Sequence, residues 1–196
     1  MHAMKNSNFF YKTLLPKTYR KQDFFDYYSR DRCMVGEKFD GNIVEKGLLI
    51  EDIPALLMIS LNNNIAEANL DLDGSVKNFT ESNFKILVKK ILGLDQNIDD
   101  FENSIDQTEM KKSLEKTKGL RIICTPTVFE AFTRSVFSQQ VSLNVAIKMR
   151  RKFIELINIS HSSGIMCYPT AQHVINFTEK EIKSVGCSLS RVFCIG

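Results

Sequence analysis

The sequence contains no tryptophan, only four prolines and nine glycines, and no hydrophobic run long enough to cross a membrane. The low glycine and proline content excludes collagen-like and low-complexity proteins. A composition of 43% hydrophobic and 25% charged residues is typical of a folded globular protein. The net charge of +3 is too small to indicate an anionic partner by itself. The 196 residues suffice for one sizeable domain or two small ones.

Cysteine pairs of the kind that hold zinc or form redox motifs are also missing. The five cysteines are dispersed, with no Cys-x-x-Cys spacing, and their odd number favours a reducing compartment. No apolar signal segment precedes the fold. We therefore expect an intracellular protein, in the cytoplasm, nucleoid or nucleus, with no membrane contact, no metal ion and no small-molecule cofactor.

Period-two alternation marks the first part of the chain. Residues 66–73 place apolar side chains on one face and polar ones on the other, which is typical of a half-buried antiparallel strand, and Asp73-Gly74 supplies a turn. Segments 42–50 and 55–61 are further strand candidates, and 24–30 is predicted to be a short helix. A basic arm precedes them and is expected at the surface.

Helical periodicity replaces this alternation from Phe84 onward. The stripe from Phe84 to Leu92 predicts an amphipathic helix that Gly93 closes. Six acids and no base between Asp95 and Glu109 are interpreted as a solvated helical connection, because the spacing is not that of a calcium loop. A further helix is expected to end at Gly119.

Capping signals predict where the later helices begin. Thr127 and Glu130 form a capping-box pattern, Ser142 can cap a second helix, and Thr178-x-x-Glu181 repeats the box. A last helix is expected after Ser188. The fold class predicted from these patterns is α+β. Residues 1–92 form an antiparallel β domain with flanking helices, and residues 93–196 form an all-α domain.

The weak positive charge concentrates in the helical pair after Thr127. Segment 131–155 holds five basic residues and one acid, Glu155; the basic residues are Arg134, Lys148, Arg150, Arg151 and Lys152. Such a run is either a solvated helix face or a contact surface for nucleic acid.

Several segments carry a resemblance to a known family. Its core segments are Gly119-Leu120-Arg121-Ile122, Thr125 to Phe132, Val136 to Ser142 and Ala146. Outer segments on both sides of this core match in the same order. They are Leu92 to Asp95 and Phe101 before it, and Tyr168-Pro169-Thr170, Glu181, Val185 to Ser188 and Arg191 after it. Together they resemble the N-terminal and central part of the 3-methyladenine DNA glycosylase II family, which belongs to the helix-hairpin-helix base-excision glycosylases.

The resemblance implies a TATA-binding-protein-like β domain followed by a helical glycosylase domain that is incomplete at its C-terminus. Its partner would be double-stranded DNA with damaged bases. Gln140 matches the residue inserted into the stack that an extruded base leaves, and Gln139 and Ser142 support the turn. The alternative is that both glutamines satisfy backbone groups at a helix corner. Phosphate contacts would come from Arg134, Lys148, Arg150 and Arg151.

The resemblance also defines what the chain lacks. The nearest candidates for an aromatic base pocket are Phe24, Tyr27 and Tyr28, which could equally be core residues. No Leu-x-Gly-x-Gly hairpin follows Arg191, and the last acid is Glu181, so we assign no catalytic residue and expect the chain alone to be inactive. The alternatives are a non-catalytic DNA-binding or structural module and an oxidised-guanine glycosylase of the same superfamily.

Overall fold

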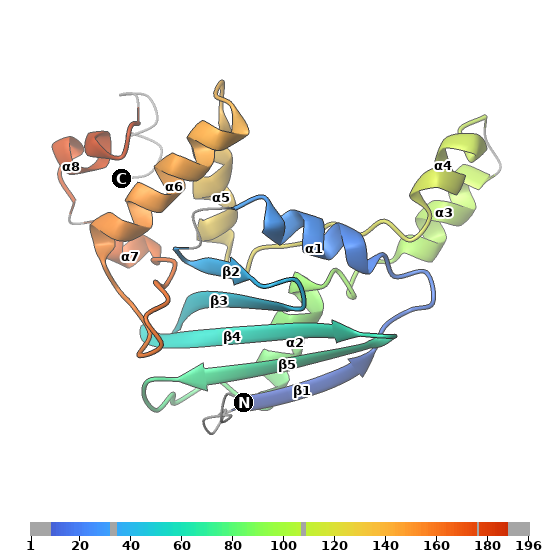
Figure 1. Cartoon of the computed structure of the whole chain (residues 1–196), viewed down its shortest axis with the longest axis horizontal. Coiled ribbons are helices and arrows are strands. Elements are labelled where there is room, and N and C mark those ends of the chain that lie inside the picture. The colour runs from blue at the N-terminus through green and yellow to red at the C-terminus, as the bar shows by residue number, and fades with distance from the viewer. Residues whose placement is uncertain (1–8, 32–34, 107–108, 176, 188–196) are drawn as a thin grey trace.

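The computed structural model describes residues 9–31, 35–106, 109–175 and 177–187. Its first part is a five-stranded, fully antiparallel sheet in the order β1-β5-β4-β3-β2 (Figure 1). The strands are β1 (Phe9–Leu14), β2 (Glu37–Phe39), β3 (Ile43–Ile50), β4 (Ile53–Asn62) and β5 (Ile65–Leu72). Consecutive strands β3, β4 and β5 pair through tight turns, so the centre of the sheet is a meander.

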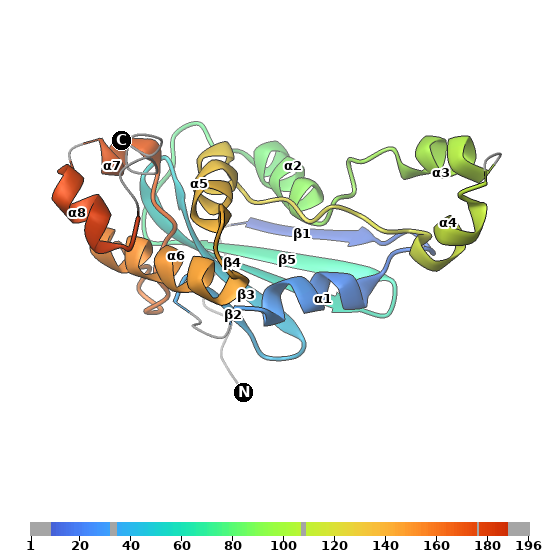
Figure 2. The ribbon, with the colours of Figure 1, turned by 90° about the horizontal axis from the view of Figure 1, so that it is seen from above.

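Helices lie beside the sheet and at both of its ends. They are α1 (Lys21–Ser29), α2 (Glu81–Ile91), α3 (Ile98–Asp106), α4 (Lys111–Thr117), α5 (Val128–Ser138), α6 (Leu143–Ile157), α7 (Ala171–Val174) and α8 (Glu179–Ser184). Helices α3 and α4 stand at one end of the molecule and α5 to α8 at the other, joined by an extended connection between α4 and α5 (Figures 1 and 2). No helix in the described ranges is both long and apolar enough to span a bilayer.

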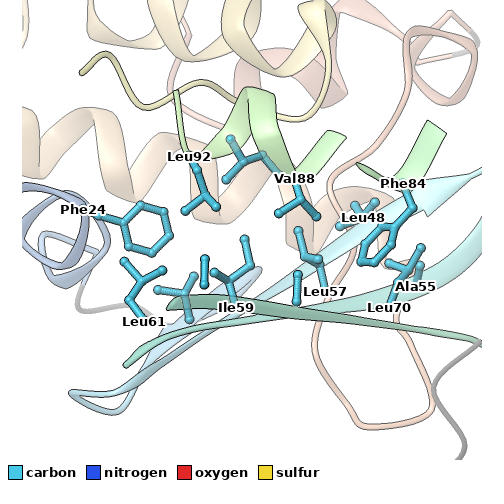
Figure 3. Close-up of a cluster of buried hydrophobic side chains, with 14 of the residues drawn as sticks. Phe24, Leu48, Ala55, Leu57, Ile59, Leu61, Leu70, Phe84, Val88 and Leu92 are labelled. Atoms are coloured by element: carbon cyan, nitrogen blue, oxygen red, sulfur yellow. The ribbon is translucent and has the colours of Figure 1, made fainter. Parts of the chain in front are cut away.

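The main hydrophobic core lies between one face of the sheet and helices α1 and α2 (Figure 3). Leu57 and Ile59 of β4 point into it, because alternate residues of a strand share a face. Phe24 of α1 and Val88 of α2 meet them there, and all four side chains are at most 1% exposed. The sheet and both helices therefore form one packed unit.

A second core joins the later helices. Phe137 of α5 and Phe153 of α6 pack edge to face, with ring centroids 5.3 Å apart. Tyr168 closes the cluster, and its hydroxyl lies 2.6 Å from the hydroxyl of Thr133 inside α5. Both hydroxyls are buried, so this hydrogen bond satisfies two groups that would be costly to leave unpaired.

The segment after α6 returns to the sheet. Ser160 and Met166 form an isolated antiparallel bridge, and the Tyr168 amide donates to the Gly47 carbonyl at 3.2 Å. A Cβ atom on Gly47 would lie 2.2 Å from the Met166 carbonyl oxygen, so only glycine admits this crossing. Nearby, His161 Nε2 lies 3.2 Å from a carboxylate oxygen of Asp73. The later helices are thus attached directly to the sheet.

The predicted α+β class is confirmed, with the strands at 42–50, 55–61 and 66–72 found close to their expected positions. The segment before Asp23 is at the surface as expected, with Lys12 and Lys17 exposed, but it is not an arm outside the sheet, because residues 9–14 form edge strand β1, in which Lys12 pairs with Glu67. The sequence patterns also missed β2 and α7. The helix expected after Ser188 lies outside the described residues. A domain boundary at residue 93 stays a prediction.

Candidate functional site

The turn between α5 and α6 lies at the outer end of this helical pair (Figure 1). Helix α5 begins where the Thr127 hydroxyl accepts from the Glu130 amide at 3.1 Å, and it ends at Ser138. Gln140 has φ of 53°, in the left-handed region that residues other than glycine rarely adopt. Its side chain is exposed and makes no hydrogen bond within the described part of the chain. Gln140 is therefore not explained as a corner residue that satisfies neighbouring backbone groups.

Helix α6 starts immediately after this turn. Ser142 stands at the N-cap position, as expected, but its hydroxyl makes no capping hydrogen bond. Leu143 is 56% exposed and Val145 43% exposed, so apolar side chains also face solvent beside the glutamines. The end of the α5–α6 pair thus presents a glutamine and two aliphatic side chains outward.

A cleft of about 200 Å³ opens next to the turn, between α1, α5 and α6. One set of its lining residues is aromatic or aliphatic: Tyr27, Phe137, Leu143, Ala146 and Ile147. Another set is charged: Arg30, Asp31, Glu37, Arg134 and Arg150. A cleft lined by both apolar and polar side chains can hold a flat ring by its face and by its edge.

Buried ion pairs join two of the charged lining residues, Glu37 and Arg134, to Lys46 and Glu130. Lys46 of β3 is almost fully buried, with Nζ 2.6 Å from Glu37 Oε1 and 2.7 Å from Glu130 Oε1. Arg134 lies one turn after Glu130 on α5 and binds both carboxylates. Because Glu130 is used in this way, its carboxylate does not complete the capping box predicted at the start of α5. The contacts connect strands β2 and β3 to α5.

Arg150 of α6 extends the cluster by pairing with Asp31 and approaching Glu37 Oε2 at 3.6 Å. We call these six groups the ionic network: Asp31, Glu37, Lys46, Glu130, Arg134 and Arg150. It contains three carboxylates and three cations, so its formal charges balance. Burial by itself would raise the pKa of Glu37, but Lys46, Arg134 and Arg150 outweigh it and hold that pKa well below its ordinary value.

Of the basic residues predicted to contact DNA, some are largely buried in the structure and others are exposed. The side chains of Arg134 and Arg150 are only 16% and 11% exposed and are engaged in the ionic network, so neither belongs to a solvated helix face. Arg151 pairs with Glu155 one turn away on the exposed face of α6. Lys148 is exposed on the same helix. The phosphate role of all these residues stays a prediction.

Only one of the three aromatic residues predicted for the base pocket lines the cleft. Phe24 and Tyr28 are 1% and 4% exposed and belong to the main core, so neither lines the cleft. Tyr27 does line it, and its hydroxyl accepts from Arg134 at 3.1 Å. The three residues lie within about one turn of α1. The sequence alone did not show which side of that helix faces the later helices.

Arg30 is a site residue that the sequence patterns did not single out. It follows the last turn of α1, lines the cleft and is exposed. No sequence motif marks it, because only the fold brings the end of α1 next to α5 and α6. In the described ranges, no group of three His, Cys, Asp or Glu side chains is arranged to hold a metal ion.

Comparisons with known proteins agree with this geometry. No family model matches the sequence. The chain is 22% identical over 183 residues to the DNA-3-methyladenine glycosylase of Bacillus subtilis, a match that covers 90% of this chain and 60% of that protein. A 3-methyladenine DNA-glycosylase from Archaeoglobus fulgidus superimposes with a TM-score of 0.74 at 15% identity, over 94% of this chain and 64% of that one. The chain thus has the fold of this 3-methyladenine DNA-glycosylase.

A second solved structure has a similar fold. The 8-oxoguanine glycosylase/lyase of Clostridium acetobutylicum, in complex with DNA containing cytosine opposite 8-oxoguanine, gives a TM-score of 0.65 at 14% identity, over 97% of this chain and 64% of that one. The resemblance to 3-methyladenine DNA glycosylases read from the sequence is thus confirmed for this glycosylase fold. The chain spans less than two thirds of the length of these relatives.

Proposed function

We propose that this chain is the DNA-engaging N-terminal and central part of a base-excision DNA glycosylase that acts on alkylated purines such as 3-methyladenine. Its partner is double-stranded DNA that contains a damaged base. The observation that carries the proposal is the turn at Gln140, which is exposed, held in the left-handed region and placed beside a cleft. An enzyme that extrudes a base needs both a side chain to fill the gap and a space for the base.

Gln140 is the proposed wedge, with Gln139 and Ser142 shaping the turn. A left-handed residue other than glycine costs about 1–2 kcal/mol, a cost that is typical of functional turns. Leu143 adds an apolar surface that can contact exposed base faces. Lys148 and Arg151 on the outer face of α6 are the proposed phosphate contacts on this side of the cleft.

The cleft is the proposed receiving space for the extruded base. Tyr27 and Phe137 offer ring surfaces, and base–aromatic stacking contributes about 1–3 kcal/mol per base. The carboxylates of the cleft, Asp31 and Glu37, are both neutralised by cations of the ionic network. Breaking a glycosidic bond places positive charge on the sugar, which a free carboxylate must stabilise. We therefore assign no catalytic residue to the described part of the chain.

The structural likeness to an 8-oxoguanine glycosylase/lyase makes oxidised guanine the alternative substrate. The TM-score is higher for the 3-methyladenine enzyme, 0.74 against 0.65, and the curated relative is also named for 3-methyladenine. These observations support the alkylated-purine proposal over the oxidised-guanine alternative. An intracellular site of action stays a prediction.

The test uses duplex DNA with the fluorescent base 2-aminopurine at a destabilised mismatch. We expect the 196-residue chain to raise the 2-aminopurine fluorescence on binding, because the base leaves its stack. Gln140→Ala should keep the fold, bind roughly 5- to 10-fold more weakly and lose most of the fluorescence rise, in line with a loss of about 1–1.4 kcal/mol. Gln172→Ala, which removes an exposed glutamine on α7, is the matched control.

The outcomes separate the alternatives. Binding without a fluorescence rise in the wild-type chain would favour the non-catalytic DNA-binding module. Absence of any binding to DNA at low salt would refute the proposed function. Equal losses in Gln140→Ala and Gln172→Ala would remove the special role of the turn.

A further inference from the structure

The cations of the cleft are not equivalent. Arg134 and Arg150 are held by carboxylates of the ionic network, whose six formal charges cancel. Arg30 lines the same cleft, is exposed, and has no ion pair within the described part of the chain. The net positive charge of the cleft lining therefore comes from Arg30.

The position of Arg30 differs from that of the cations on α6. It stands at the C-cap of α1, a helix of the sheet-bearing part, whereas Lys148 and Arg151 lie on the later helical pair. Ser138 and Leu143, which flank the Gln140 turn, line the same cleft. Arg30 thus borders the cleft from α1, while the turn borders it from α5 and α6.

We propose that Arg30 is a backbone-phosphate contact for the DNA strand that enters the cleft, so that DNA is held from α1 as well as from α6. This inference rests on the proposed function. The guanidinium carries a fixed charge and a planar set of donors that match two phosphate oxygens. A phosphate contact fixes the position of the strand without reading its sequence. Arg30 would therefore position the nucleotide beside the cleft for any base.

A purely structural role predicts a different behaviour. A cation at the C-terminal end of a helix stabilises the helix dipole and changes folding stability, but it does not change the salt dependence of DNA binding. Each phosphate neutralised by a protein cation contributes about 0.9 to the slope of log K against log salt on duplex DNA. The slope therefore distinguishes a DNA contact from a helix-capping cation.

The experiment measures duplex DNA binding by fluorescence anisotropy across a salt series, with the 196-residue chain and three variants. Arg30→Gln should bind roughly 3- to 10-fold more weakly at low salt and lower the slope by about 1, the value expected for one lost phosphate contact. Arg30→Lys should retain the slope but bind less tightly than arginine, because the paired donors are lost. Lys17→Gln, an exposed charge before the other end of α1, is the matched control and should leave both quantities unchanged.

The results also separate this inference from the proposed function. If the wild-type chain binds DNA with a clear salt slope and Arg30→Gln matches Lys17→Gln, the Arg30 contact is refuted while DNA binding stands. If the wild-type chain does not bind DNA, the proposed function fails first. Thermal unfolding of each variant shows whether Arg30→Gln is folded. A lowered melting temperature with an unchanged slope would assign Arg30 to the helix end alone.

Discussion

Removal of the Lys46 charge tests the ionic network directly. Lys46 is 3% exposed and contacts two carboxylates, Glu37 and Glu130, that are 7% and 1% exposed. In Lys46→Met a side chain of similar length remains, but three carboxylates then face two cations. Breaking a buried ion pair by removing one partner costs about 3–5 kcal/mol, since the other charge stays buried and uncompensated. That is a large fraction of the roughly 5–15 kcal/mol that separates folded from unfolded domains.

The measurement is urea unfolding at pH 7, followed by far-ultraviolet circular dichroism. Lys12→Met provides the matched control, because Lys12 pairs with Glu67 across two strands at 2.7 Å but its side chain is 53% exposed. Exposed pairs contribute about 0–1 kcal/mol, so the control should unfold nearly as the wild type does. Adding Glu130→Gln to Lys46→Met restores the charge balance and should recover part of the loss.

The dependence of folding stability on acidic pH is a second measurement for the same substitution. The pKa of Glu37 is lowered in the folded protein, so its contribution to stability is complete above its ordinary pKa of 4.5 and is lost as pH falls toward the folded value. Lys46→Met removes the nearest cation and raises this pKa. The gap in stability between wild type and variant should therefore persist through mildly acidic pH and narrow once the pH falls below the raised Glu37 pKa of the folded variant. A loss at pH 7 no larger than that of Lys12→Met would refute the reasoning about the network.

Two further outcomes are expected. Gly47→Ala should destabilise the protein by at least about 1–3 kcal/mol in urea unfolding, because the new Cβ would overlap the Met166 carbonyl, whereas Gly74→Ala, whose Cβ would find its nearest atom at 3.4 Å, should cost much less. The 196-residue chain should release no free 3-methyladenine from alkylated DNA above a no-protein control. Release that Glu155→Gln or Glu130→Gln abolishes would contradict our assignment of no catalytic residue.

The sheet and the main helices were predictable because their signals are local. Alternation over 66–72 and the Thr178–Glu181 capping box depend only on neighbours in sequence, and both are found. Strand β1 was not predictable, since its residues read as a basic arm until β5 supplies their partners. Within the candidate site, a sequence motif marks only the turn at Gln139, Gln140 and Ser142, and the role of these residues stays a prediction.

The rest of the site depends on distant contacts. Nothing near Arg134 in sequence shows that Glu37 and Lys46 will surround it, so its charge read as a surface feature. The exposed face of α5 is similar: Phe132 lies one turn before the buried Val136, yet it is 46% exposed. Periodicity identifies a helix and one apolar side, but it does not show which elements cover that side.

The crossing of the 160–168 segment over Gly47 bears on the order in which the protein folds. The two contacting stretches are separated by most of the chain, so their contact closes a long loop and loses the corresponding chain entropy. Local hairpins and helices form before such distant contacts. The meander β3–β4–β5 can therefore fold early, whereas the cleft, which needs both α1 and the α5–α6 pair in place, is completed last. A chain still emerging from the ribosome would hold an assembled sheet well before it could present a site to DNA.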